Sequence, residues 1–120
     1  SLDYPDFLIA SSEWFAFVPA KEYFDEPGDH ADELETSVMM HYHPELVNLD
    51  EAGNGDYKKF TSQMLNEKVA WIPRNWQKVS QDTGIGNPKK ASAGKGKKYA
   101  EAVVAKYALL FEELVHKELY

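Results

Sequence analysis

The sequence predicts an α/β domain, a parallel β-sheet flanked by helices, of which this chain supplies only the C-terminal part. Residues 7–10 form a continuous apolar run, which is typical of a strand buried on both faces of a parallel sheet. Two later segments carry apolar residues at helical spacing and suit packing on a sheet. Because one such strand needs neighbours on both sides, residues 1–120 are expected to be the C-terminal part of a single larger domain, or a chain that docks on a partner.

The strand is placed at residues 6–12, and a first helix is predicted at residues 30–42. Asp29 is its expected N-cap, and Pro44 ends it. The apolar face of this helix is formed by Ala31, Leu34, Val38 and Tyr42.

The second half of the chain is predicted to hold an interrupted extended segment and a long helix. Residues 68–80 have a strand-like composition, but Pro73 makes an edge strand or an extended arm the better interpretation. Ser92 is placed to cap a helix that runs to about residue 118. Its apolar stripe consists of Ala100, Val103, Val104, Tyr107, Leu110, Phe111 and Leu114.

Composition and charge exclude several classes of partner. The chain has 20 acidic and 13 basic residues and a net charge of -7, which argues against binding duplex nucleic acid. It has no cysteine, hence no disulfide or thiolate site, which is compatible with the reducing cytoplasm that we expect. No apolar run approaches the roughly 20 residues that span a bilayer, and the first residues lack the features of a signal peptide.

His30 and Glu35 are the two residues of the first helix that invite a chemical interpretation. If Asp29 is the cap, His30 lies at the first helical position, where the helix dipole disfavours added positive charge. A neutral imidazole there could accept a proton and pass it on, or His30 could be a surface residue at a helix start. Glu35 lies on the apolar face, so it is expected to be buried and hydrogen-bonded, either supporting an active site or simply holding the loop before His30.

Two other patterns have simpler interpretations. His41 and His43 point in different directions in a helix, and the favourable dipole at a helix C-terminus explains them better than a metal does. Five lysines fall within residues 89–98, but Gly96 follows Lys95 where a P-loop needs Ser or Thr. A solvated face, or contact with an acidic neighbouring subunit, is the favoured interpretation of these lysines.

Three tryptophans, Trp14, Trp71 and Trp76, could line a pocket, although tryptophan more often packs in a core or an interface. Trp14 is the best candidate, because it follows the predicted strand and ligands of open α/β sheets bind at the C-terminal ends of strands.

The stretch "DHADELETSVMMHYHPELVNLDEA" resembles the creatininase (creatinine amidohydrolase) family. The family signature, His-Ala/Gly-x-x-Glu-Thr-Ser-x-Met followed by Pro-x-Leu-Val, is matched by His30, Ala31, Glu35, Thr36, Ser37, Met39, Pro44, Leu46 and Val47. The later "GNPKKASAGKGKKYAEAV" is similar to the family's C-terminal segment, with Gly96 before the last long helix.

The resemblance implies a creatininase-like domain that hydrolyses small amide or cyclic amide C–N bonds with a divalent metal pair of zinc, manganese or iron. The ligands of that pair are expected mostly outside this chain, in the N-terminal half of the same domain. His30 matches the family's proton-shuttle histidine, and Trp14 matches an active-site tryptophan. Trp14, Glu26 and Asp29 are expected to contact the substrate, and Glu35 to support the "PGDH" loop.

The substrate that the resemblance implies need not be creatinine. Glu26 stands where creatininase itself has a second tryptophan, so a formamide or a small peptide is an alternative substrate. A metal-dependent amidohydrolase, expected to be a homo-oligomer with no nucleic-acid or membrane partner, is therefore the favoured function. A non-catalytic assembly module that completes a sheet or an oligomer interface is the alternative.

Overall fold

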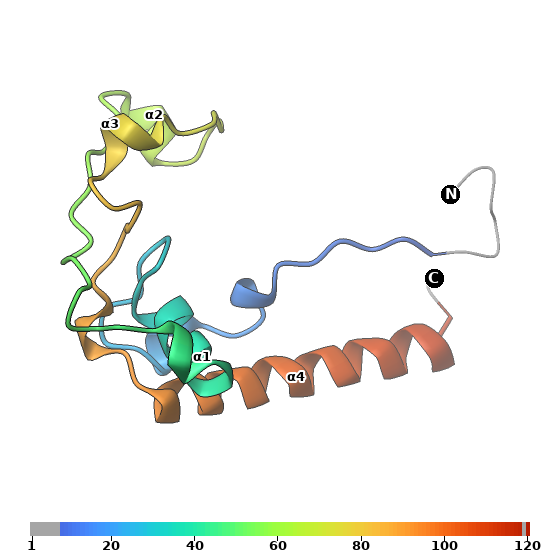
Figure 1. Ribbon diagram of the computed structural model, residues 1–120. Coiled ribbons are helices and arrows are strands. Elements are labelled where there is room, and N and C mark those ends of the chain that lie inside the picture. Colours follow the sequence, from blue (N-terminus) through green and yellow to red (C-terminus); the bar gives the residue numbers. More distant parts are fainter. Residues whose placement is uncertain (1–7, 119) are drawn as a thin grey trace.

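The protein is described by a computed structural model, which covers residues 8–118 and 120. Short helical turns and loops lie around α1 and the first turns of α4, the two longer helices (Figure 1). In chain order the helical elements of this part are η1 (Trp14–Ala16), η2 (Ala20–Glu22), α1 (Glu33–Tyr42), η3 (Pro44–Leu46), α2 (Gln63–Asn66), α3 (Trp76–Val79), η4 (Pro88–Lys90) and α4 (Ala93–His116).

The predicted parallel sheet is wrong, because residues 8–118 and 120 contain no β-strand. Residues 8–12 of the predicted strand are irregular, and Leu8 and Ile9 are 55% and 82% exposed; residues 6 and 7 lie outside the described part. Within the part of the chain that the structure describes, β-type pairing is limited to two isolated antiparallel bridges, His30 with Ile85 and Tyr57 with Ser80. An apolar run becomes a strand only beside another strand, and the described residues offer it none.

The edge strand predicted at residues 68–80 is also absent, and the alternative of an extended arm describes this region better. Residues 57–80, called the arm from here on, project away from α1 and α4 and carry α2 and α3 (Figure 1). The amide of Lys58 donates to the carbonyl of Val79 at 2.8 Å, which closes the arm at its base.

Helix α1 begins later than predicted, at Glu33 instead of His30. Its N-cap is Asp32, whose side chain accepts a hydrogen bond from the amide of Glu35. Ala31 has a φ of 48°, a left-handed conformation that cannot be part of a right-handed helix, so Asp29 cannot be the cap. The helix ends at Tyr42, close to the position predicted from Pro44.

The first turns of α4 pack against α1. Ser92 caps α4 as predicted, accepting a hydrogen bond from the amide of Lys95 at 3.3 Å. Gly96 permits the close approach, because a Cβ there would overlap the carbonyl oxygen of Ser37 in α1. Tyr99 is fully buried and donates a hydrogen bond to the carbonyl of Phe15 at 2.9 Å. The buried apolar cluster consists of Val18, Phe24, Leu34, Tyr99 and Val103.

The C-terminal half of α4 extends beyond this cluster (Figure 1). Val104 and Phe111 of the predicted apolar stripe are 58% and 59% exposed, and Val115 is 74% exposed, so part of the apolar surface of α4 is not covered by the described residues. Among the described helices, none is both long and apolar enough to cross a membrane.

Candidate functional site

The loop that leads to His30 is fixed by the N-cap of α1. Asp32 is 3% exposed, and its Oδ2 accepts a hydrogen bond from the amide of Gly28 at 2.5 Å while its Oδ1 accepts from the amide of Glu35 at 2.9 Å. One carboxylate therefore ties the loop to the first turn of the helix. Support of the loop before His30, which the sequence assigned to Glu35, is provided in part by Asp32, because Asp32 lies where that loop meets α1.

Glu33 binds the same loop at Glu26, two residues before Gly28. It is fully buried, and its Oε2 accepts a hydrogen bond from the amide of Glu26 at 2.6 Å while its Oε1 lies 2.5 Å from Nζ of Lys95. Lys95 also donates to Asp25 at 2.8 Å, and this hydrogen bond lowers the pKa of the Asp25 carboxyl. The hydrogen bonds to Asp25 and then to Glu33 raise the pKa of Lys95. A charged network thus joins α4, α1 and the loop.

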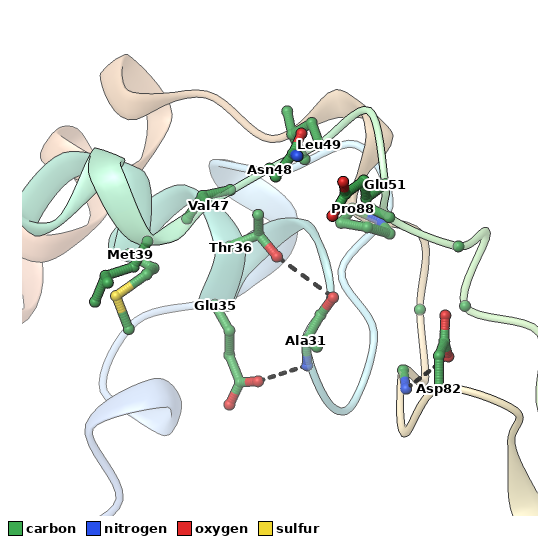
Figure 2. A pocket seen from close by; sticks show the side chains of 16 residues that line it. Ala31, Glu35, Thr36, Met39, Val47, Asn48, Leu49, Glu51, Asp82 and Pro88 are labelled. Carbon is green, nitrogen blue, oxygen red and sulfur yellow. Dashed lines mark hydrogen bonds between the residues drawn. The ribbon is translucent and has the colours of Figure 1, made fainter.

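Glu35 is less buried than predicted, with 38% of its side chain exposed. Its Oε2 accepts a hydrogen bond from the amide of Ala31 at 2.6 Å, so it supports the turn after His30 and not the loop before it (Figure 2). The same oxygen lies 3.5 Å from Nδ1 of His30. Glu35 is thus the carboxylate that reaches the imidazole.

His30 is held by its backbone and leaves its ring partly exposed. Its amide donates to the carbonyl of Ile85 at 3.0 Å, and the amide of Ile85 donates back to the carbonyl of His30 at 2.8 Å. The side chain is 45% exposed, and its ring centroid lies 5.2 Å from that of Trp76 at an interplanar angle of 51°. His30 also lies before the N-cap, so the helix-dipole argument for a neutral ring, which assumed the first helical position, does not apply to it.

Asp29 connects the loop to the arm. Its Oδ2 lies 2.7 Å from Nη2 of Arg74, a contact between residues 45 positions apart in the sequence. The guanidinium carbon of Arg74 lies 5.5 Å from the ring centroid of Trp76, within cation–π range. The sequence named Trp76 only as one of three tryptophans that could line a pocket and did not single out Arg74, since their contacts with Asp29 and His30 depend on the path of the arm.

Two open cavities flank the turn that carries His30; they are lined by its neighbours Ala31 and Asp29 and not by His30 itself. The larger, of about 480 Å³, is lined on one side by Ala31, Glu35 and Thr36 and on another by Asp82 (Figure 2). The second, of about 420 Å³, is lined by Glu26, Pro27, Gly28, Asp29, Tyr57, Ile85, Gly86 and Asn87. The structure therefore brings the predicted substrate-binding residues Glu26 and Asp29 to one cavity.

Glycines allow the backbones beneath this turn to approach closely. Gly86, which borders both cavities, has a φ of 123°, and a Cβ there would lie 2.9 Å from the Cα of Gly28. Gly55 also has a positive φ, of 73°, and a Cβ there would overlap the carbonyl oxygen of Gly86. Gly55 of "GNG" and Gly86 of "GIG" thus have a packing role.

Trp14 packs against the buried apolar cluster. Its ring centroid is 6.2 Å from that of Tyr99 and 6.0 Å from that of Phe15, with edge-to-face geometry. It lines neither of the two cavities. The tryptophan beside His30 is Trp76, and a role of Trp14 in substrate binding stays a prediction.

The two histidines at the C-terminal end of α1 and the lysine cluster make local contacts. His43 Nδ1 lies 3.2 Å from Glu45, and the ring of His41 lies 4.6 Å from that of Tyr42. Four of the five lysines contact groups of the same chain: Lys89 the carbonyl of Leu49, Lys90 Glu26, Lys95 Asp25 and Glu33, and Lys97 Glu101. Acidic neighbours within the chain therefore account for most of the cluster.

Metal-ligating side chains are not gathered in this part of the protein. Within residues 8–118 and 120, no group of three or more His, Asp or Glu side chains is placed to hold an ion. The described residues alone therefore do not fit the divalent metal pair that the sequence resemblance implied.

Comparison with known proteins supports the family resemblance of the signature. The family model described as "Creatininase: Creatinine amidohydrolase" matches residues 6–111. A solved structure described as "Putative creatinine amidohydrolase" from Bacteroides fragilis is 58% identical, with a TM-score of 0.90; the match covers 99% of this chain and 47% of that chain. No curated protein matches this sequence.

The chain belongs to the creatininase family, because the family model matches most of its length. It spans about half the length of the solved relative. Membership supports an amidohydrolase at the family level, and the substrate and mechanism are matters of proposal.

Proposed function

We propose that the full-length protein hydrolyses the C–N bond of a small amide or cyclic amide, and that His30 delivers a proton to the leaving nitrogen. The observation that supports this proposal is the way in which the backbone and the ring of His30 are placed. In a chain of the creatininase family, its backbone is fixed to Ile85 while its ring stays partly exposed on a turn between two cavities.

In the proposed reaction, the oxygen of water adds to the amide carbonyl, and the C–N bond breaks. The products are a carboxylic acid and an amine, or one ring-opened molecule that carries both groups. The nitrogen leaves as a neutral amine only if it gains a proton, and a histidine near neutral pH can supply one and be reprotonated by the proton that water releases. With Nδ1 directed at Glu35, the opposite nitrogen, Nε2, is the atom that would exchange the proton.

Activation of the water is assigned to groups outside this chain. A divalent metal pair of zinc, manganese or iron is proposed for the full-length enzyme, with ligands mostly in the N-terminal half of the domain. What residues 1–120 contribute is the positioned imidazole and the walls of the two cavities.

The proposed substrate is small and bears N–H groups. Glu26 and Asp29 add carboxylates to the wall of the smaller cavity, and a carboxylate accepts hydrogen bonds from an amide or a guanidine-like nitrogen. Creatinine, a formamide and a small peptide all satisfy this requirement.

The remaining half of a family-length domain is the proposed partner for the exposed face of α4. The solved relative is about twice as long as this chain, and Val104, Phe111 and Val115 leave apolar surface to be covered. A homo-oligomer of the full-length protein is proposed as well, and its mass in solution distinguishes it from a monomer.

The same exposed face favours the alternative function, a non-catalytic assembly module. An amidohydrolase turns over a small amide, and an assembly module does not. The test is to incubate the full-length protein with creatinine, formamides and short peptide amides and to measure release of amine or of the ring-opened product. Turnover of at least one of them is expected. Absence of turnover from a folded, metal-replete protein would favour the assembly module.

A further inference from the structure

The contacts of the arm with the turn that carries His30 go beyond the presence of a histidine in the signature. They rest on the proposed function, because they concern how His30 is aimed.

The arm returns to the body beside His30. Its base is closed by the bridge between Tyr57 and Ser80, and Arg74 and Trp76 lie on the returning side, just before that bridge. Arg74 binds the carboxylate of Asp29, the residue before His30, at 2.7 Å. Trp76 lies against the ring of His30 itself, with centroids 5.2 Å apart.

These contacts form a closed circuit. Asp29 is joined to His30 by the chain, His30 contacts Trp76, the Trp76 ring lies 5.5 Å from the guanidinium carbon of Arg74, and Arg74 returns to Asp29. A half-exposed imidazole would otherwise sample several rotamers. With Trp76 beside the ring and Glu35 3.5 Å from Nδ1, the side chain is restricted on two sides.

We infer that Trp76 and Arg74 are positioning residues for proton transfer by His30, acting through the imidazole and not on the substrate. Trp76 restricts the ring directly, and Arg74 restricts the loop and the indole together. The arm is therefore part of the catalytic apparatus, although it projects away from the body of the chain.

The test is a double-mutant cycle in the full-length enzyme, measured on the amide that the wild type turns over. Trp76→Ala should lower kcat by about 10- to 100-fold with a smaller change in KM, because a misplaced catalytic group loses effective concentration. Trp76→Phe, which keeps an aromatic ring beside His30, should recover most of the rate. Trp71→Ala is the matched control, since Trp71 lies on the same arm and is 83% exposed.

The decisive comparison uses His30→Ala as the background. If Trp76 acts through His30, adding Trp76→Ala to His30→Ala should change kcat by less than about twofold. Multiplicative losses in the double variant, or a Trp76→Ala enzyme with the wild-type kcat, would overturn the inference. A wild-type rate in His30→Ala would instead reject the proposed function and, with it, the role of Trp76.

A second readout does not depend on turnover. The indole ring current should shift the imidazole proton resonances of His30, and Trp76→Ala should remove that shift while Trp71→Ala keeps it. If Trp76→Ala does not fold, Arg74→Ala replaces it in the same cycle, with the same non-additivity expected. Imidazole resonances that are unchanged in Trp76→Ala would contradict the geometry.

Discussion

The packing of α4 on α1 makes a sharp prediction for two glycines that lie two positions apart. Gly96 and Gly94 are both in the first turns of α4, but only Gly96 faces α1. A Cβ at Gly96 would overlap the carbonyl oxygen of Ser37 and lie 2.8 Å from the amide nitrogen of Val38, whereas a Cβ at Gly94 would meet nothing within 4 Å.

The expected magnitudes follow from these contacts. Because the atoms that a Gly96 methyl meets belong to backbone, no rotamer change relieves the overlap, and overpacking of this kind costs about 1–3 kcal/mol. We expect Gly96→Ala near the upper end, about 3 kcal/mol, offset by a helix-propensity gain of about 1 kcal/mol. Gly94→Ala should show only the gain. The two variants should therefore differ by about 3 kcal/mol in free energy of unfolding.

Urea denaturation of the full-length protein, followed by circular dichroism, measures this difference. A lower midpoint with an unchanged m-value for Gly96→Ala, and an equal or higher midpoint for Gly94→Ala, is the expected result. Equal midpoints for the two variants would refute the close approach of α1 and α4.

Three further predictions concern the carboxylates around His30. Glu33→Gln should lower the free energy of unfolding in urea by about 2–3 kcal/mol, because it weakens a buried charge-assisted pair with Lys95. The control, Glu101→Gln on the surface of α4, should cost less than about 0.5 kcal/mol. Equal costs for the two variants would contradict the buried network. The hydrogen bond from Lys95 holds the pKa of Asp25 below its ordinary value of 3.8. The stability that this pair adds should therefore be present above pH 3.8 and be lost as the pH falls through the lower pKa of the folded state. If Asp25→Asn leaves the stability–pH curve unaltered in this acid range, the pair is contradicted. Glu35→Gln should cost only about 0.5–1 kcal/mol of thermal stability, since 38% of the side chain is exposed, and a loss above about 3 kcal/mol would mean that Glu35 is buried in the full-length protein.

The local signals in the sequence predicted the two longer helices, α1 and α4, but neither the short helices α2 and α3 nor the absence of a sheet from the described residues. Ser92 and Pro44 act locally, so the start of α4 and the end of α1 could be predicted from them. The apolar run at residues 7–10 carries no information about its neighbours, and a strand requires a neighbour. The start of α1 differs from the prediction because Ala31 has a φ of 48°, beside a His30 that pairs with Ile85, more than 50 residues away.

The candidate site was predictable in its signature residue and not in its surroundings. His30 could be selected by resemblance, and Glu26 and Asp29 do reach one cavity. Trp14 was favoured over Trp76 because the predicted strand placed it at a sheet edge, and that sheet is absent from the described residues. Arg74 and Trp76 reach the His30 loop only through the path of the arm, which no local pattern encodes.

The central claim, that His30 is the proton donor, is tested most directly by His30→Ala in the full-length enzyme. Turnover is measured on two amides of the same acid that differ only in the basicity of the amine released, with metal content and folding checked in parallel. We predict a fall in kcat of about 10²- to 10⁴-fold for the more basic leaving amine, a smaller fall for the less basic one, and unchanged metal content. An unchanged kcat on both amides, or a loss that matches the fraction of unfolded or metal-free protein, would contradict the role of His30.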